Sequence, residues 1–146
     1  MEALPEIGHF LAEMSLSVTH PSLVAVVDDD DSVREALESL LKSRGYKVDT
    51  YSAAEDFQNS PSRPRTDCLI LDVRLNGMSG PALQQELIAA RDSLPIVFIT
   101  AHADERLRTE VIEAGAINCF MKPFNDDELL AAVELGVRTG GSEAVA

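Results

Sequence analysis

The chain has 146 residues, 45% of them hydrophobic, which is the size of one domain with a substantial core. Its net charge of −13, from 25 acidic and 12 basic residues, argues against direct binding to nucleic acid or to an anionic membrane surface, since both need a basic face. There are two cysteines without a Cys-x-x-Cys pair, no apolar run long enough to span a bilayer, and no basic start typical of a signal peptide. We therefore expect a cytoplasmic protein that does not associate with membranes.

Residues 1–21 differ in character from the rest of the chain. Four apolar residues there have the spacing that gives a short helix one apolar stripe: Ile7, Phe10, Leu11 and Met14. Such a stripe would dock on the domain or on a second protomer, which leaves a homodimer open. Short isolated helices are marginal in water, so we expect a frayed N-terminal extension. It ends at His20-Pro21, because the residue before proline is disfavoured in helical geometry.

Five short segments are predicted to be strands. They are Leu23–Val27, Lys47–Tyr51, Cys68–Asp72, Ile96–Thr100 and Asn118–Met121. The segments that begin at Leu23, Cys68 and Ile96 are apolar without a polar break until their ends, as is typical of strands buried on both faces of a parallel sheet.

A helical pattern follows each predicted strand. We expect five helices. The first lies at about Ser32–Arg44, the second begins at Ser52, the third has Pro81 in its first turn and runs through about Arg91, the fourth lies at about Asp104–Ala114, and the fifth runs from residues 125–128 to about Val137. Ser32-x-x-Glu35 and Ser52-x-x-Glu55 have the spacing of a capping box. This alternation predicts an α/β flavodoxin-like, doubly wound three-layer sandwich, with five helices and a five-stranded parallel sheet in the order 2-1-3-4-5. The domain would span residues 22–138, followed by a loose C-terminal tail at 139–146.

Polar side chains stand at the carboxyl ends of four predicted strands. The first strand ends in Asp28 and Asp29, the third in Asp72, the fourth in Thr100 and the fifth in Lys122. Parallel strands open at one edge, and the first and third are neighbours at the switch point, so these side chains should meet in one crevice. Two carboxylates about 4 Å apart repel by roughly 4 kcal/mol at an effective dielectric of about 20. Such a cluster favours a hard divalent cation, and oxygen ligands suggest Mg²⁺, or Mn²⁺ as a substitute, over Zn²⁺.

Each of these residues also has a simpler explanation. Asp28–Asp31 alone would serve as a solvated helix cap, and Asp72 alone would end its strand and turn the chain. Thr100 would be an ordinary strand end and Lys122 a surface lysine. Their joint occurrence favours a site. His102 lies two residues after Thr100, but a lone loop histidine usually faces solvent, so we leave it out of the chemistry.

Four motifs resemble the receiver domain of bacterial two-component response regulators. In chain order they are Val26-Val27-Asp28-Asp29, Leu71-Asp72, Thr100-Ala101 and Lys122-Pro123. The match covers about residues 23–137. The loop at residues 72–80 also resembles that of receivers of the nitrogen-fixation regulator type.

The resemblance implies that Asp72 accepts a phosphoryl group from a histidine of a sensor kinase or phosphotransfer protein. Thr100 would donate a hydrogen bond to the phosphoryl oxygens and Lys122 would pair with them, with a cis peptide bond between Lys122 and Pro123. Phosphoryl transfer independently requires positioning and positive charge near those oxygens. The domain would not be an enzyme in the usual sense, since it would catalyse only its own phosphorylation and dephosphorylation.

The resemblance also implies a set of metal ligands. Asp29 and Asp72 would bind Mg²⁺ directly, together with the main-chain carbonyl of Arg74, and Asp28 would act through water.

Three other classes of protein share part of this pattern. A haloacid-dehalogenase-type phosphatase needs a second aspartate two residues after the first, where this chain has Arg74. A flavodoxin or nucleotide-binding protein needs a phosphate-cradling loop after the first strand, where the carboxylates at 28–31 would repel phosphate. A pseudo-receiver that acts as a protein-interaction scaffold without phosphorylation remains the alternative.

Two features bear on the output of such a domain. The chain ends eight residues after Arg138, so we expect no output domain in this chain. The signal would pass to a downstream protein target or a phosphorelay step, unless a domain was lost by truncation.

In many receivers an aromatic residue lies three positions before the lysine of the fifth strand, and here that residue is Cys119. Phe120 should face the opposite side of the strand, which puts coupling through an aromatic side chain in doubt.

Overall fold

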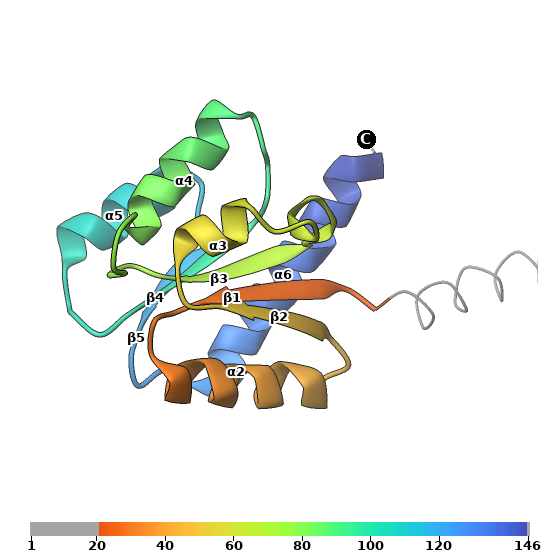
Figure 1. The fold of residues 1–146 in the computed structure, drawn as a ribbon, viewed down its shortest axis with the longest axis horizontal. Helices are drawn as coiled ribbons and strands as arrows, with labels where there is room; N and C mark the ends of the chain where they lie inside the picture. The colour runs from red at the N-terminus through yellow and green to blue at the C-terminus, as the bar shows by residue number, and fades with distance from the viewer. Residues whose placement is uncertain (1–20, 146) are drawn as a thin grey trace, which may run out of the picture.

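The computed structural model describes residues 21–145, in which a single five-stranded parallel sheet lies between two layers of helices (Figure 1). The strand order is β2-β1-β3-β4-β5, as the sequence predicts. The strands are β1 (Leu23–Val27), β2 (Lys47–Tyr51), β3 (Cys68–Asp72), β4 (Ile96–Thr100) and β5 (Asn118–Met121). All five have the predicted bounds, because each segment ends at polar residues or turn signals.

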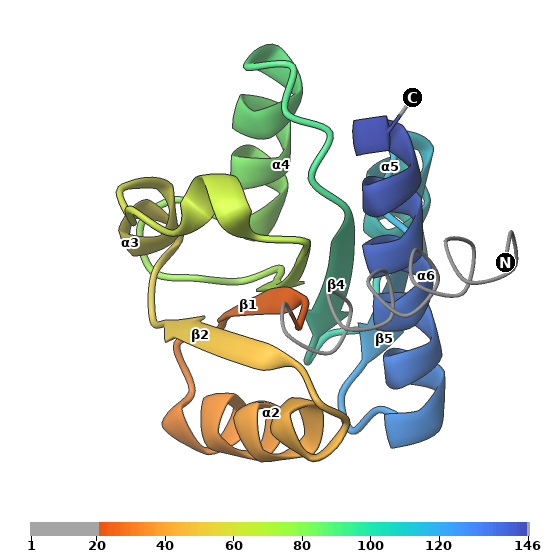
Figure 2. The ribbon, with the colours of Figure 1, turned by 90° about the vertical axis from the view of Figure 1, so that its right-hand side faces the viewer.

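The helices cover both faces of the sheet. They are α2 (Asp31–Ser43), α3 (Ala54–Gln58), α4 (Gly80–Ala89), α5 (Glu105–Glu113) and α6 (Asp126–Val145), with a short 3-10 helix, η1, at Arg63–Arg65. Figure 1 shows α3 and α4 on one side of the sheet and α2 on the other, and Figure 2 shows the same separation in a view turned by 90°. Helix α5 shares its apolar core with α3 and α4, whereas α6 shares its core with α2. The flavodoxin-like three-layer fold is confirmed.

Two apolar cores flank the sheet, since successive residues of a strand point to opposite faces. Leu69 and Leu71 of β3 pack on the side of α3, α4 and α5, whereas Ile70 packs on the side of α2 and α6. Every residue of β3 and β4 is buried. These two strands and the buried part of β1 form the rigid centre whose carboxyl edge holds the site.

Helix ends differ from the prediction in four places. The cap of α2 is Asp30, whose carboxylate accepts hydrogen bonds from the amides of Ser32 and Val33, in place of Ser32 itself. A carboxylate is a stronger acceptor than a hydroxyl. At α3 the cap residue is Ala53, which makes no side-chain bond, so Ser52 does not cap that helix.

The other two differences lie at helix C-termini. Helix α4 ends at Ala89, before the predicted Arg91, because Arg91 adopts a left-handed conformation with φ 57°. Helix α6 continues to Val145, although a loose tail was expected from Thr139. Glycine in a helix costs about 1 kcal/mol relative to alanine, but it does not by itself stop a helix.

Both cysteines are buried and unpaired. Cys68 lies on β3 and Cys119 on β5, and β4 separates these two strands. The helical stripe expected between Ile7 and Met14 lies outside the described residues. Within 21–145, none of the helices combines the length and apolar character that crossing a membrane would require.

Candidate functional site

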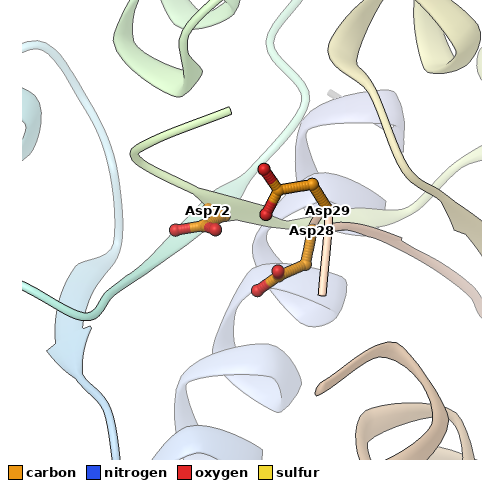
Figure 3. A group of neighbouring side chains, drawn as sticks. All are labelled: Asp28, Asp29 and Asp72. Carbon is orange, nitrogen blue, oxygen red and sulfur yellow. The ribbon is translucent and has the colours of Figure 1, made fainter. Parts of the chain in front are cut away.

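Three carboxylates meet at the carboxyl edge of the sheet. Asp28 directly follows β1 and is completely buried, Asp29 is exposed, and Asp72 is the last residue of β3 with 5% of its surface exposed. One carboxylate oxygen from each lies within 4.8 Å of the other two. Figure 3 shows Asp28 and Asp29 leaving the end of β1 and Asp72 leaving the neighbouring strand, with the three side chains gathered in one place. The predicted convergence of these carboxylates is confirmed, because the β1 and β3 strands pair in register up to Val27 and Leu71.

Lys122 brings a positive charge to this cluster. Its ammonium nitrogen lies 2.8 Å from Asp28 Oδ2 and 3.4 Å from Asp72 Oδ2. The Lys122 amide donates to the carbonyl of Thr100 over 2.7 Å, which anchors the residue beside the end of β4. The peptide bond between Lys122 and Pro123 is cis, as the family resemblance implies.

The surroundings of Asp28 fix its orientation. Its Oδ1 accepts a hydrogen bond of 2.9 Å from the Asp30 amide, while its Oδ2 accepts from Lys122. Its amide donates to the carbonyl of Tyr51, and its own carbonyl accepts from Nη1 of Arg34 over 2.7 Å. A buried carboxylate is tolerated only when it is paired and hydrogen-bonded, and Asp28 meets both conditions.

The electrostatics of Asp72 differ from those of a surface aspartate. Burial first, and then the negative charge of Asp28, raise the pKa of Asp72 to about 6. Lys122 and the Arg74 amide, which donates to this carboxylate, act in the opposite direction. Burial on its own lowers the pKa of Lys122, but the hydrogen bond and charge of Asp28 outweigh it, so the pKa of Lys122 is raised and its ammonium stays charged.

Thr100 stands at the same edge but faces a different partner. It is 7% exposed at the end of β4, and its hydroxyl oxygen accepts a 3.2 Å bond from the His102 amide. The same hydroxyl lies 3.3 Å from the His102 carbonyl, to which it donates. Thr100 therefore holds the loop after β4 and makes no hydrogen bond to the carboxylates among the described residues.

The residues present fit a hard divalent cation. Three clustered carboxylates, one of them solvent-exposed, provide oxygen ligands and an excess of negative charge that a single lysine offsets only in part. No histidine or cysteine belongs to this cluster, so the donor set suits Mg²⁺ better than Zn²⁺.

The sequence does not indicate the partners of two residues near the site. Arg34 lies within the helix predicted at about Ser32–Arg44, and its guanidinium donates to the Asp28 carbonyl. Glu55 has the spacing of a capping box, but its carboxylate accepts from the amide of Met78, 23 residues further along the chain, over 3.0 Å. The sequence shows only that both are charged residues near the start of a helix, and this pattern does not identify a partner that is distant in the chain.

Comparison with known proteins agrees with this geometry. The model of the response regulator receiver domain matches residues 24–134. The response regulator protein TodT of Pseudomonas putida is 41% identical over 117 residues, which cover 80% of this chain and 52% of TodT. The transcriptional regulatory protein FixJ of Bradyrhizobium diazoefficiens is 35% identical over 127 residues, covering 84% of this chain and 62% of FixJ. The chain thus spans about half to three fifths of the length of these curated relatives.

Solved structures give the same result. The response regulator StyR superposes with a TM-score of 0.79 at 45% identity, over 85% of this chain and 63% of that one. The FixJ-N structure superposes with a TM-score of 0.72 at 30% identity, over 82% and 95% of the two chains. The fold and the carboxylate cluster of Asp28, Asp29 and Asp72 together define a flavodoxin-like signalling domain. More specifically, the chain belongs to the response regulator receiver domain family of two-component systems.

Proposed function

We propose that Asp72 accepts a phosphoryl group from a phosphohistidine of a sensor histidine kinase or phosphotransfer protein, in a Mg²⁺-dependent reaction. The observation that carries this proposal is the position of the Lys122 ammonium, 2.8 Å from Asp28 and 3.4 Å from Asp72 at the open edge of the sheet. A half-buried lysine beside a carboxylate nucleophile supplies positive charge where the equatorial phosphoryl oxygens would lie.

In this proposal the residues have distinct roles. An Asp72 carboxylate oxygen attacks phosphorus, and a P–O bond forms as the P–N bond to the histidine breaks. The histidine leaves with the electron pair of that bond and takes up a proton. Lys122 turns from Asp72 toward the phosphoryl oxygens, since Asp72 is the more distant of its two partners. Thr100 donates to a phosphoryl oxygen after releasing the His102 carbonyl.

The metal ligands proposed for Mg²⁺ are Asp29, Asp72 and the main-chain carbonyl of Arg74, with Asp28 acting through water. When bound, the ion would offset the negative charge on the phosphoryl oxygens. Asp28 is held by Asp30 and Lys122 and is fully buried, which suits an indirect role, whereas Asp29 is exposed.

The finer assignments also belong to this proposal. The domain itself spans residues 22–138, between an N-terminal extension and residues 139–146, of which those through Val145 continue α6. It acts in the cytoplasm as a phosphoacceptor and not as a general enzyme. Its output passes to a protein target, without direct nucleic-acid or membrane contact by the domain, in keeping with the net charge of −13.

Intact-mass spectrometry after incubation with acetyl phosphate and Mg²⁺ tests the proposal. We expect one added phosphoryl group, labile to base and to hydroxylamine, on the peptide that contains Asp72, and none in Asp72→Asn. Asp92→Asn is a suitable control, because Asp92 follows the C-terminal end of α4, whereas Asp72 precedes its N-terminal end, and Asp92 pairs with Arg63. No adduct on the wild-type chain, together with no response to beryllofluoride, would support a non-phosphorylated scaffold.

A further inference from the structure

The segment between Asp72 and α4 carries the Arg74 carbonyl, and it has few anchors. The side chains of Leu75 and Met78 pack against the core on the side of α3, α4 and α5. At its end, the Gly80 amide donates to the Val73 carbonyl over 3.0 Å. Within residues 75–78, the bond from the Met78 amide to Glu55 is the one hydrogen bond to another element in the described part of the chain.

Glu55 is well placed to hold this segment. It lies in α3, where its neighbours Ala54 and Phe57 are completely buried, so the helix is a fixed platform. Its Oε2 accepts from the Met78 amide over 3.0 Å. The same oxygen would be 2.6 Å from a Cβ on Gly77, which has φ +78°. The loop backbone therefore bends directly against this carboxylate.

The carboxylate is charged at neutral pH. The backbone amides of Glu55 and Met78 lower the pKa of Glu55 below its usual value. Its second oxygen, Oε1, is shielded from solvent and has no hydrogen-bond partner among the described residues. A capping box does not account for the contact with Met78, because the Glu55 carboxylate makes no hydrogen bond to the cap residue Ala53 and its local bond is to its own amide.

We propose that Glu55 is a positioning residue for the metal site: its carboxylate fixes the loop at Gly77 and Met78 and thereby sets the direction of the Arg74 carbonyl. This inference rests on the proposed function, in which that carbonyl binds Mg²⁺. Glu55 acts through the loop and touches neither metal nor phosphoryl group. Residues that orient metal ligands in this way typically change metal affinity about 10- to 100-fold when removed.

Three substitutions separate the effect of the length of the Glu55 side chain from the effect of its negative charge. Glu55→Ala removes the contact, Glu55→Gln keeps an acceptor oxygen at the same distance, and Glu55→Asp keeps the charge but withdraws it by one methylene. Mg²⁺ affinity is measured by calorimetry for each variant. We expect Kd to rise about tenfold for Glu55→Ala and Glu55→Asp, and to stay within about twofold of wild type for Glu55→Gln.

A matched control is Asp56→Ala, which removes an exposed carboxylate from the same first turn of α3. It should leave Kd unchanged while sharing any effect on helix stability. A second readout is the rate of phosphorylation by acetyl phosphate as a function of Mg²⁺. In Glu55→Ala the rate at saturating Mg²⁺ should approach that of wild type, because the metal site and not the nucleophile is displaced.

The outcomes distinguish this inference from the proposed function. If the wild-type chain neither binds Mg²⁺ nor is phosphorylated, the proposed function fails. If the wild type does both and Glu55→Ala binds Mg²⁺ equally well, only the role of Glu55 is overturned. It is also overturned if Glu55→Gln loses as much affinity as Glu55→Ala, since charge would then be the cause. Should Glu55→Ala fail to fold, Glu55→Asp provides the same comparison with the charge retained.

Discussion

Gly80, the first residue of α4, packs directly against the main chain of Asp72. A Cβ at position 80 would collide with the Asp72 carbonyl oxygen and would lie 3.1 Å from both the Asp72 carbonyl carbon and Cε1 of Phe98. Because backbone atoms cannot rotate out of the way, only glycine allows the helix to start so close to the end of β3. This contact fixes where the proposed phosphoacceptor lies relative to α4.

We predict that Gly80→Ala destabilises the fold by about 1–3 kcal/mol, the usual cost of overpacking. The comparison is Gly136→Ala in α6, where the nearest atom to the new Cβ would be Ile117 Cδ1 at 2.7 Å, the movable end of a side chain. Urea denaturation should show the larger loss for Gly80→Ala. Equal losses would mean that α4 shifts easily away from Asp72.

The burial of Asp72 predicts a gain in stability when its charge is removed. Its pKa is about 6 in the fold and 3.8 in the unfolded chain, so the native state binds a proton more tightly. The free energy of unfolding should therefore fall as pH rises from about 4 to 6. Without metal at pH 7, Asp72→Asn should raise it by about 1–2 kcal/mol, less than the full shift implies because the Lys122 contact is weakened.

Urea titrations at pH 4.5 and pH 7, in the presence of a chelator, test this expectation. The difference in the free energy of unfolding between wild type and Asp72→Asn gives the contribution of the Asp72 carboxylate alone. Adding Mg²⁺ to wild type at 100 times its Kd should stabilise the fold by about 2.7 kcal/mol if the ion binds only the native state. Unfolding that is insensitive to both the variant and Mg²⁺ would contradict the picture of mutually repelling carboxylates.

Much of the fold was predictable because its signals are local. The run from Cys68 to Asp72 is apolar up to its last residue, and that pattern alone indicates a buried strand that ends in a carboxylate. Parallel topology then brings Asp28, Asp72 and Lys122 together, since all three follow strands whose ends share one edge. Helix boundaries were less accurate, because Asp30 and Ser32 both satisfy the rules for a cap and the choice depends on tertiary geometry.

Long-range polar contacts were not predictable in the same way. Glu55 and Met78 are 23 positions apart, and the sequence gives no sign that a helix acid accepts a loop amide. The hydroxyl of Thr100 bonds to the main chain of His102, and no pattern in the sequence indicates that contact. Side-chain direction at a strand end depends on the following loop, which has no periodic pattern to interpret.

Lys122→Ala should separate stability from metal binding. The change leaves the completely buried Asp28 without its ammonium partner, and loss of one member of a buried pair costs about 3–5 kcal/mol. Mg²⁺ should nevertheless bind more tightly, since the ammonium no longer competes for Asp28 and Asp72. Phosphorylation by acetyl phosphate should be slower.

The control for this variant is Lys42→Ala, which removes an exposed ammonium that pairs with Glu38 four residues earlier on α2. It should change stability by no more than about 0.5 kcal/mol and leave Mg²⁺ affinity unaltered. Weaker Mg²⁺ binding in Lys122→Ala would show that the lysine organises the metal site and does not oppose it.

The last prediction concerns Cys119, which is 7% exposed and lies on the face of β5 that packs on the side of α3, α4 and α5. It lines a pocket of about 160 Å³ together with Thr100 and Met121. Burial raises the pKa of the Cys119 thiol, and it raises that of Cys68 to about 12, so both should react slowly with alkylating reagents. Phe120 packs on the opposite face of the strand, as expected from alternation, so it cannot fill this pocket.

Because Thr100 and Cys119 share the pocket, movement of Thr100 toward a phosphoryl group should change access to the thiol. We expect the alkylation rate of Cys119, measured by mass spectrometry in a Cys68→Ala background, to change when beryllofluoride and Mg²⁺ are added. Mg²⁺ alone should have no such effect, nor should beryllofluoride with Asp72→Asn. If Cys119 merely fills space, the two rates will be equal, and position 119 then has no part in transmitting the state of Asp72 to the surface formed by α5 and β5.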